Sequence, residues 1–556
     1  MNDGADAYTI FVDGTLDGTT DGAYLGDNGM ADFSELDKNL TLTIKALSET
    51  AKATLDGGAR FDASGNATNE GIGKRIINAK PASGALNLTL ENLVIKGGYT
   101  TANGGGIYFN PASGTLTMNK CEISGNISTH TLGGGGGIYN KGTLTMKDCT
   151  ISENKVQWYG GGVYNYGTLT ITGGTISDNT TWRSGGGIYN YGGTATITGC
   201  TIKSCKVEER DVGDYRYGGA GIYITGGGSL TAEGCEITEN TVTSGIAVYG
   251  AGVYVYEGTF IMEDGTKISK NRADWEGGGV YVAYSGSTFI MNGGEISGNH
   301  GVLRGDELSA EYKASVGGGG VCVSRGGAFT MNHGSITGNT SGTVGGGVYV
   351  SNYSYGAGTF TMKGGAISGN TASEDGGGVY VYQEPSSYTA MFTMEDGTIS
   401  GNTAGGDGGG VALKGGMFIL ESGTISINKA VYGAGIHVSG GGTFAMENGT
   451  ISGNIADGKN DSGGGGIHLF NGTVEMSGGE IIENHAKGTA EGAGGGGIYI
   501  YHSNVNTFTM TGTAKISNND AVRHGGGVYQ GAGSNFTSNI MGNISGNNPD
   551  EVYNEP

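Results

Sequence analysis

The hydrophobic and polar positions of this chain repeat in blocks of three short segments. One block consists of residues 160–164 (Gly-Gly-Gly-Val-Tyr), 167–171 (Gly-Thr-Leu-Thr-Ile) and 175–179 (Thr-Ile-Ser-Asp-Asn). Apolar and polar residues alternate within each segment, which is the pattern of a β-strand with one buried face. Strands of this length cannot bury that face alone. The pattern therefore predicts that successive blocks stack on one another.

Three such strands in every block predict an all-β fold, a parallel β-helix solenoid of about 16 or more three-stranded coils. The coil is expected to be right-handed, because parallel crossover connections are right-handed. Residues 96–556 form the regular series. Residues 1–95 are less regular, and we interpret them as an N-terminal cap with opening coils. Strands are expected there at residues 8–12, 40–46, 53–55, 75–78 and 86–90.

The third segment ends in Asn in nearly every block. Asn suits a sharp corner because it tolerates the left-handed conformation, and its amide can bond to the Asn of the next coil, forming a ladder. Gly98 and Cys205 are the two departures from this pattern. A row of metal or sugar ligands is the functional alternative. The expected structural ladder consists of Asn126, Asn154, Asn179, Asn240, Asn271, Asn299, Asn339, Asn370, Asn402, Asn428, Asn454, Asn484, Asn519 and Asn547.

The outward position of the first segment is most often Tyr. His437 and His468 interrupt this row, and long insertions border it on both sides. The rings can cover the bare glycine backbone beside them. A row of exposed rings between loops is also a platform for sugar rings or for a protein partner. The candidate binding residues are Tyr164, Tyr189, Tyr223, Tyr254, Tyr281, Tyr349 and Tyr380.

Two short motifs add further candidates. Arg304, Gly305 and Asp306 lie in the longest insertion and match the integrin-binding tripeptide, although so short a motif also occurs by chance. Acidic turns such as residues 263–265 (Glu-Asp-Gly) and 374–376 (Glu-Asp-Gly) could hold calcium, but they lack the spacing of a dedicated calcium loop. We expect no metal site and no other cofactor.

Composition narrows the class of partner. The net charge of −22 and the pI of about 4.7 argue against nucleic acid and against an anionic membrane surface. No apolar run reaches the roughly 18 residues of a membrane span. The first residues do not resemble a signal peptide, and we expect a monomeric piece of a larger exported protein.

Four cysteines are expected to face the core, since each lies two residues before an inward Ile. Cys121 and Cys149 lie in neighbouring blocks, as do Cys200 and Cys235. Buried thiols are one interpretation. Disulfides between adjacent strands are the other, although the in-line geometry of neighbouring strands suits them poorly.

Residues 134–138 (Gly-Gly-Gly-Gly-Ile), together with 123–126 (Ile-Ser-Gly-Asn), resemble the GGA[IV] and FxxN repeats of the chlamydial polymorphic outer membrane proteins. Residues 42–45, 55–58 and 92–95 also resemble their wider right-handed β-helix relatives. The resemblance implies a secreted or surface-displayed bacterial protein, and members of this family are often adhesins. This chain departs from the family pattern by placing Ile or Leu where the repeat has Phe.

These observations favour an adhesin or display protein at the bacterial cell surface or outside the cell. Its expected partner is an extracellular glycan or a host protein, bound on the Tyr-lined sheet. A passive structural stalk is one alternative. A polysaccharide lyase or hydrolase is the other, but the outward positions of the first segment contain no carboxylate pair, so we expect no enzyme.

Overall fold

The computed structural model describes most of the chain, and the described part contains no α-helix. It has one 3-10 turn, η2 (Met541–Asn543), and no described helix is long and apolar enough to cross a membrane. The described residues are 7–17, 29–34, 36–58, 74–208, 217–243, 248–302, 316–353, 355–385, 387–458, 463–539 and 541–555.

The chain divides into two units, Met1–Lys267 and Ile268–Pro556, and both are built from the same coil. In the first unit, every strand of one coil pairs in parallel and in register with its counterpart in the next. The first of these coils consists of β18 (Val163–Asn165), β19 (Thr168–Thr172), β20 (Thr175–Ser177) and β21 (Thr180–Thr181). The next consists of β22 (Ile188–Tyr191), β23 (Thr194–Thr198), β24 (Thr201–Lys203) and β25 (Lys206–Glu208).

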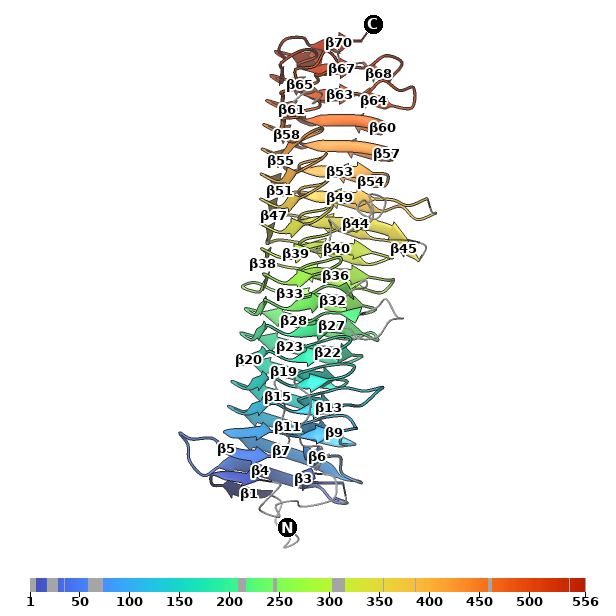
Figure 1. Cartoon of the computed structure of the whole chain (residues 1–556). Helices are drawn as coiled ribbons and strands as arrows, with labels where there is room; N and C mark the ends of the chain where they lie inside the picture. The colour runs from blue at the N-terminus through green and yellow to red at the C-terminus, as the bar shows by residue number, and fades with distance from the viewer. Residues whose placement is uncertain are drawn as a thin grey trace. The chain divides into compact units, whose positions relative to one another are not determined.

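The second unit repeats this arrangement (Figure 1). One coil consists of β49 (Val379–Tyr382), β50 (Met391–Met394), β51 (Thr398–Ser400) and β52 (Thr403–Ala404). It pairs with β53 (Val411–Lys414), β54 (Met417–Leu420), β55 (Thr424–Ser426) and β56 (Lys429–Ala430). Next come β57 (Ile436–Met446) and β60 (Ile467–Met476), which run without a break through the first and second segments. In Figure 1 they are the two long orange arrows.

The predicted parallel β-helix is confirmed, with one addition. The regular coils described above have the three predicted strands and also a two- or three-residue strand directly after the corner residue: β21, β25, β52 and β56. These short strands form a sheet of their own. They were not predicted because two residues are too few to show a period.

The strands expected near the N-terminus are also confirmed. β1 pairs in parallel with β4, and β4 pairs with β7, so the same stacking already holds there. The cap boundary at residue 95 stays a prediction. The strands are β1 (Ala7–Val12), β4 (Leu40–Ala46), β5 (Ala53–Asp56), β6 (Arg75–Ala79) and β7 (Ala85–Glu91).

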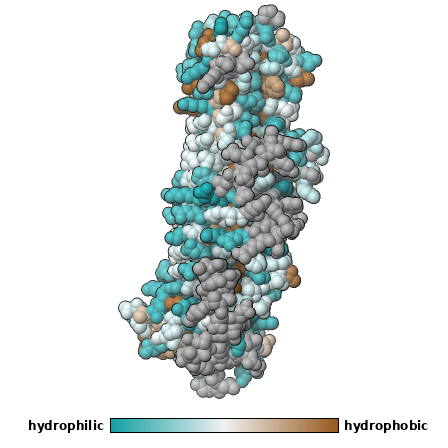
Figure 2. Space-filling model, in the orientation of Figure 1, coloured by the Kyte–Doolittle hydropathy of each residue, from teal (hydrophilic) through white to brown (hydrophobic). Residues whose placement is uncertain are grey.

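The core consists of inward side chains that stack on identical residues of the neighbouring coils. Ile123 of the third segment pairs with Ile151, and Ile151 pairs with Ile176; all three are buried. In the second unit, the rings of Phe392 and Phe418 stack with centroids 4.6 Å apart. Each coil therefore completes its core only against its neighbours. On the face shown in Figure 2, hydrophobic residues are scattered among polar ones.

The asparagine ladder is confirmed. The side-chain amide of Asn126 donates to Oδ1 of Asn154 at 3.0 Å, and that of Asn154 donates to Oδ1 of Asn179 at 3.0 Å. Each Oδ1 also accepts the backbone N–H of the preceding Asn. In the second unit the same bonds join Asn271, Asn299, Asn339, Asn370, Asn402, Asn428, Asn454, Asn484, Asn519 and Asn547 in sequence.

At two positions another side chain takes the place of a ladder Asn. In the first unit, Cys205 replaces an Asn: the amide of Asn179 approaches its Sγ at 4.0 Å, and the Cys205 N–H donates to Oδ1 of Asn240 at 3.0 Å. At the other end, Oε2 of Glu551 accepts the amide of Asn547 at 2.6 Å. A carboxylate thus takes the place that the next Asn would occupy.

The expected conformation of the corner is wrong in one respect. The left-handed residue is the one before the Asn: φ is 58° at Glu153, 57° at Asp178 and 58° at Ile427. Many coils have Gly at this position, including Gly401 with φ of 64°. The preceding residue makes the turn, and the Asn side chain points inward to form the ladder.

The structure contains a second, shorter asparagine ladder that the sequence analysis did not predict. Asn140 donates to Oδ1 of Asn165 at 2.7 Å, and Asn165 donates to Oδ1 of Asn190 at 2.7 Å; all three are fully buried. Each follows the outward Tyr of its first segment, so strict alternation places it inward. The repeated Tyr-Asn pair was a usable signal.

All six cysteines are buried and free. The buried-thiol interpretation is therefore confirmed, and none of the six forms a disulfide in this structure. Burial raises the pKa of the Cys205 thiol to about 12, which keeps it protonated at neutral pH.

The ladder generates a prediction for stability. Asn339→Ala removes the acceptor of the Asn299 N–H (2.9 Å) and the donor to the Ile296 carbonyl (2.9 Å), and both groups are buried. We expect a loss of about 2–4 kcal/mol in the free energy of unfolding. Urea denaturation measures it. Asn332→Ala, which removes one half-buried bond to Asn292 at 2.8 Å, is the control and should cost about 1 kcal/mol or less. Equal losses in the two variants would contradict a special role for the ladder.

Candidate functional site

The outward residues of the first segment, called here the outer row, are much less exposed than predicted. Tyr254, Tyr281 and Tyr349 are 0% exposed. Among the seven candidate tyrosines, Tyr164 is half-buried and the other six are buried. The expected platform of exposed rings is therefore wrong for most of the row. Burial accordingly raises the pKa of these phenols, as at Tyr223 and Tyr349.

The cover comes from the turn before each strand. The residues that lie four positions before the first-segment strands are called here the turn row. They fold over the outer row. Tyr159 stacks on Tyr189 with centroids 4.6 Å apart, and Tyr249 meets Tyr254 edge-on at 6.1 Å. The rings therefore pack between strand and turn. Arg304, Gly305 and Asp306 lie outside the described residues, and their binding role stays a prediction.

The outer row changes character in the second unit. Tyr380 pairs with Ala412, Ala412 with His437, His437 with His468 and His468 with Tyr499. The turn row alongside contains Asp375, Asp407 and Tyr432. Because Ala412 has no ring, the carboxylates have room beside the sheet between Tyr380 and His437.

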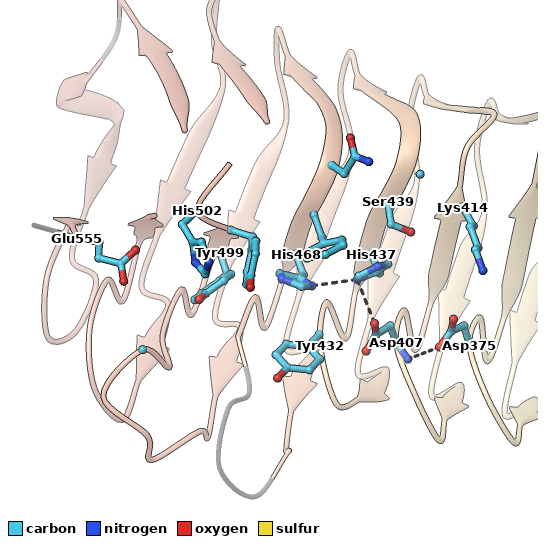
Figure 3. A pocket seen from close by; sticks show the side chains of 15 residues that line it. Asp375, Asp407, Lys414, Tyr432, His437, Ser439, His468, Tyr499, His502 and Glu555 are labelled. Carbon is cyan, nitrogen blue, oxygen red and sulfur yellow. Dashed lines mark hydrogen bonds and ion pairs between the residues drawn. The ribbon is translucent and has the colours of Figure 1, made fainter. Parts of the chain in front are cut away.

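This stretch borders a cavity of about 660 Å³ (Figure 3). In Figure 3 the carboxylate of Asp407 lies next to His437, Asp375 lies next to Asp407, and His468 lies on the other side of His437. The lining residues are Asp375, Asp407, Lys414, Tyr432, His437, Ser439, Gly440, His468, Phe470, Asn471, Gly492, Tyr499, Tyr501, His502 and Glu555.

A chain of polar contacts runs along the floor of the cavity. The Asp407 N–H donates to Oδ1 of Asp375 at 2.8 Å. Oδ2 of Asp407 lies 3.6 Å from Nδ1 of His437, and Nδ1 of His437 lies 3.0 Å from Nδ1 of His468. Since two ring nitrogens at this distance share one proton, one imidazole donates and the other accepts.

Burial shifts the pKa values of the side chains in this floor. It raises the pKa of Asp407 to about 6, and burial together with the Asp407 charge raises the pKa of Asp375. Burial lowers the pKa of His437 to about 4, and burial beside His437 holds the pKa of His468 well below its usual range. At neutral pH both imidazoles are therefore uncharged, and the floor is negative.

Aromatic rings form the wall and rim. The ring of Tyr432 stacks on His468 with centroids 5.0 Å apart, and Phe470 packs against Tyr501 at 4.7 Å. Phe470 is 43% exposed. The cavity thus combines buried polar groups with exposed aromatic surface, the usual composition of a small-molecule site.

The sequence prediction considered carboxylates only at the outward positions of the first-segment strands, and it did not extend to the turns beside them. Asp375 and Asp407 come from turns rather than from strands, so counting outward strand positions missed them. The signal was present: residues 375–379 and 407–411 both read Asp-Gly-Gly-Gly-Val. The calcium hypothesis for residues 374–376 stays a prediction. In the described part of the chain, no three His, Cys, Asp or Glu side chains are placed to hold a metal ion.

A closed counterpart lies elsewhere in the second unit. Glu276 occupies the turn row, and Cys322 replaces the Tyr of the following coil. Glu276 is 1% exposed, and burial raises its pKa to about 7. The side chain of Asp407, by contrast, is 27% exposed. A missing ring thus makes room for a carboxylate in both places: Glu276 is buried, whereas the Asp375–Asp407 pair lines the cavity.

The comparison with known families agrees with this architecture. A family model described as the right-handed β-helix region matches residues 72–202 and 137–357. Together the matches span 286 of the 556 residues, from 72 to 357, which is just over half of the chain. The chain belongs to the right-handed β-helix family. The predicted hand of the coil and the fold class are therefore confirmed.

The family assignment does not name a ligand. The matched residues end before Asp375, so the cavity lies outside them. No curated protein and no solved structure matches the chain. The closer resemblance to the chlamydial repeats stays a prediction.

The raised pKa of Asp407 generates a prediction for stability against pH. The folded state holds the Asp407 proton more tightly than the unfolded chain, whose value is near 3.8. This group therefore favours folding at low pH, and that contribution is lost as the pH rises from about 4 through about 6. Asp407→Asn should become more stable relative to wild type over this window, by on the order of 1–3 kcal/mol.

Thermal unfolding of both proteins between pH 3 and pH 8 measures the difference. Both proteins keep Asp375 and His437, so the difference comes from the Asp407 carboxyl itself and from its charge acting on Asp375. Asp457→Asn, at an exposed position outside the cavity, is the matched control. A difference between Asp407→Asn and wild type that does not change with pH would contradict the burial of this carboxylate.

Proposed function

We propose that this β-helix is an adhesin or display protein of the bacterial cell surface or the extracellular space, and that it binds a glycan in the cavity beside His437 and His468. One observation carries the proposal: a break in an otherwise covered row of rings opens a cavity with a polar floor and an aromatic rim. The binding site expected along the Tyr row is thereby moved to the place where that row is interrupted.

Size and chemistry support a sugar ligand. A cavity of about 660 Å³ lies within the usual range for small-molecule sites. The carboxylates of Asp375 and Asp407 accept hydrogen bonds from hydroxyl groups, while Asn471 and Lys414 can donate to them. The Ser439 hydroxyl already donates to the Leu413 carbonyl at 2.9 Å and can accept one. The exposed face of Phe470 and the ring of Tyr501 offer apolar surface to the C–H face of a sugar ring.

The net charge of the chain argues against two other classes of partner. A chain of net charge −22 repels nucleic acid and anionic membrane surfaces, so an extracellular glycan is favoured over both. A host protein is the other partner class, and a passive stalk is the alternative without any ligand. Binding of the full chain to an array of glycans and matrix proteins separates these three outcomes.

Replacement of a rim ring tests the site. Phe470→Ala should weaken glycan binding about tenfold, because it removes the most exposed apolar surface of the cavity. Tyr166→Ala is the matched control: Tyr166 is 46% exposed, comparable to Phe470, but belongs to the first unit and does not line the cavity. Titration calorimetry compares the two. Equal affinity in Phe470→Ala and wild type would place the site elsewhere, and no glycan binding by wild type would favour the stalk.

The carboxylate pair favours a second candidate function, cleavage of the bound glycan. A carboxyl group with a pKa of about 6 beside a second carboxylate suits a general acid at near-neutral pH. New reducing ends would reveal hydrolysis, and an unsaturated product would reveal elimination. Asp407→Asn should lower such a rate by about a hundredfold or more, while Asp457→Asn should not change it. If a glycan binds but neither product forms, the protein binds the glycan without cleaving it.

A further inference from the structure

The charges of the cavity are unbalanced. Its lining contains three carboxylates, those of Asp375, Asp407 and Glu555, and one lysine, Lys414. Among the described residues, no Lys or Arg forms an ion pair with Asp375 or Asp407. The nearest basic group to Asp407 is the imidazole of His437 at 3.6 Å, which is buried and uncharged at neutral pH.

We propose that the cavity selects a glycan whose sugar carries a free, protonated amino group, held between the carboxylates of Asp375 and Asp407. This inference rests on the proposed glycan binding and adds the class of sugar. An ammonium group has three N–H donors and no acceptor, so it pairs with carboxylate oxygens that lack a cationic partner. An N-acetylated sugar brings no charge to offset the two carboxylates.

A buried polar atom at the same place points to a ligand independently of the acids. His468 lines the cavity and is 4% exposed, and its Nε2 has no hydrogen-bond partner. Its Nδ1 already faces Nδ1 of His437 at 3.0 Å. Buried ring nitrogens normally have a partner, so an unpaired Nε2 indicates a missing hydroxyl or water beside the floor. A sugar hydroxyl next to the amino group supplies it.

The shape of the cavity favours a sugar over other cations. A lysine side chain is narrow, and it would leave the aromatic rim of Phe470 and Tyr501 without contact. A metal ion needs several ligands at short range, and no suitable group of three acidic, His or Cys side chains exists among the described residues. A ring that carries an amine uses both the negative floor and the aromatic rim.

Two oligosaccharides of equal length test the proposal: glucosamine oligomers, which carry free amines, and N-acetylglucosamine oligomers, which do not. Calorimetry with the full chain at neutral pH should show at least about tenfold tighter binding of the amine form. Asp407→Asn should remove most of this preference, whereas Asp457→Asn should keep it. Circular dichroism and thermal unfolding check that both variants fold.

Each outcome decides the question. Equal or tighter binding of the N-acetylated form overturns the amine selectivity but leaves glycan binding intact. A lysine-rich peptide that binds as tightly as the glucosamine oligomer overturns the assignment to a sugar. Binding of neither oligomer, together with no binding on a glycan array, overturns both the selectivity and the proposed function. A preference that persists in Asp407→Asn moves the amine away from the carboxylate pair.

Discussion

Hydrogen bonding between identical residues of successive coils is the constraint on which the rest of this structure depends. A typical corner Asn, such as Asn154, satisfies its buried amide with the Asn of the next coil and a carbonyl of the preceding one. A shift of one residue would leave these groups buried and unpaired, at a cost of roughly 1–3 kcal/mol each. The ladder therefore holds every coil in register, and the stacked Ile and Phe rows follow from that register.

The register of the strands also determines which side chains meet on the outer surface of the coils. Once strands are aligned, their outward residues form a continuous row, and the turn before each strand lies beside it. Large side chains of the two rows pack against one another, as Tyr159 stacks on Tyr189. A single small residue then has a large local effect: Ala412 leaves room for two carboxylates, and Cys322 for one. A site arises here from an interruption of the repeat.

The same packing decides the charge of the site. His437 and His468 occupy positions where other coils have a buried ring, so they are desolvated and uncharged at neutral pH. Asp375 and Asp407 lie at the edge, partly reached by solvent. Burial raises the pKa of both carboxyls, and Asp407, with a pKa of about 6, is mostly ionised at neutral pH. Side chains that would attract each other as ions in water are here a pair of neutral imidazoles beside negative carboxylates. That asymmetry is what an amine-bearing ligand would complement.

The sequence by itself determined the fold, the coil and the positions of the ladder, because the two-residue period and the recurring Asn depend only on local alternation. It also placed His437 and His468 on the outward row. It did not show that most of the Tyr row is covered, or that Asp375 and Asp407 meet beside His437. Those features depend on turns folding over strands and on side chains about 30 residues apart in the chain coming into contact. Only the tertiary structure brings such residues together, because alternation says which face a residue takes but not what covers that face.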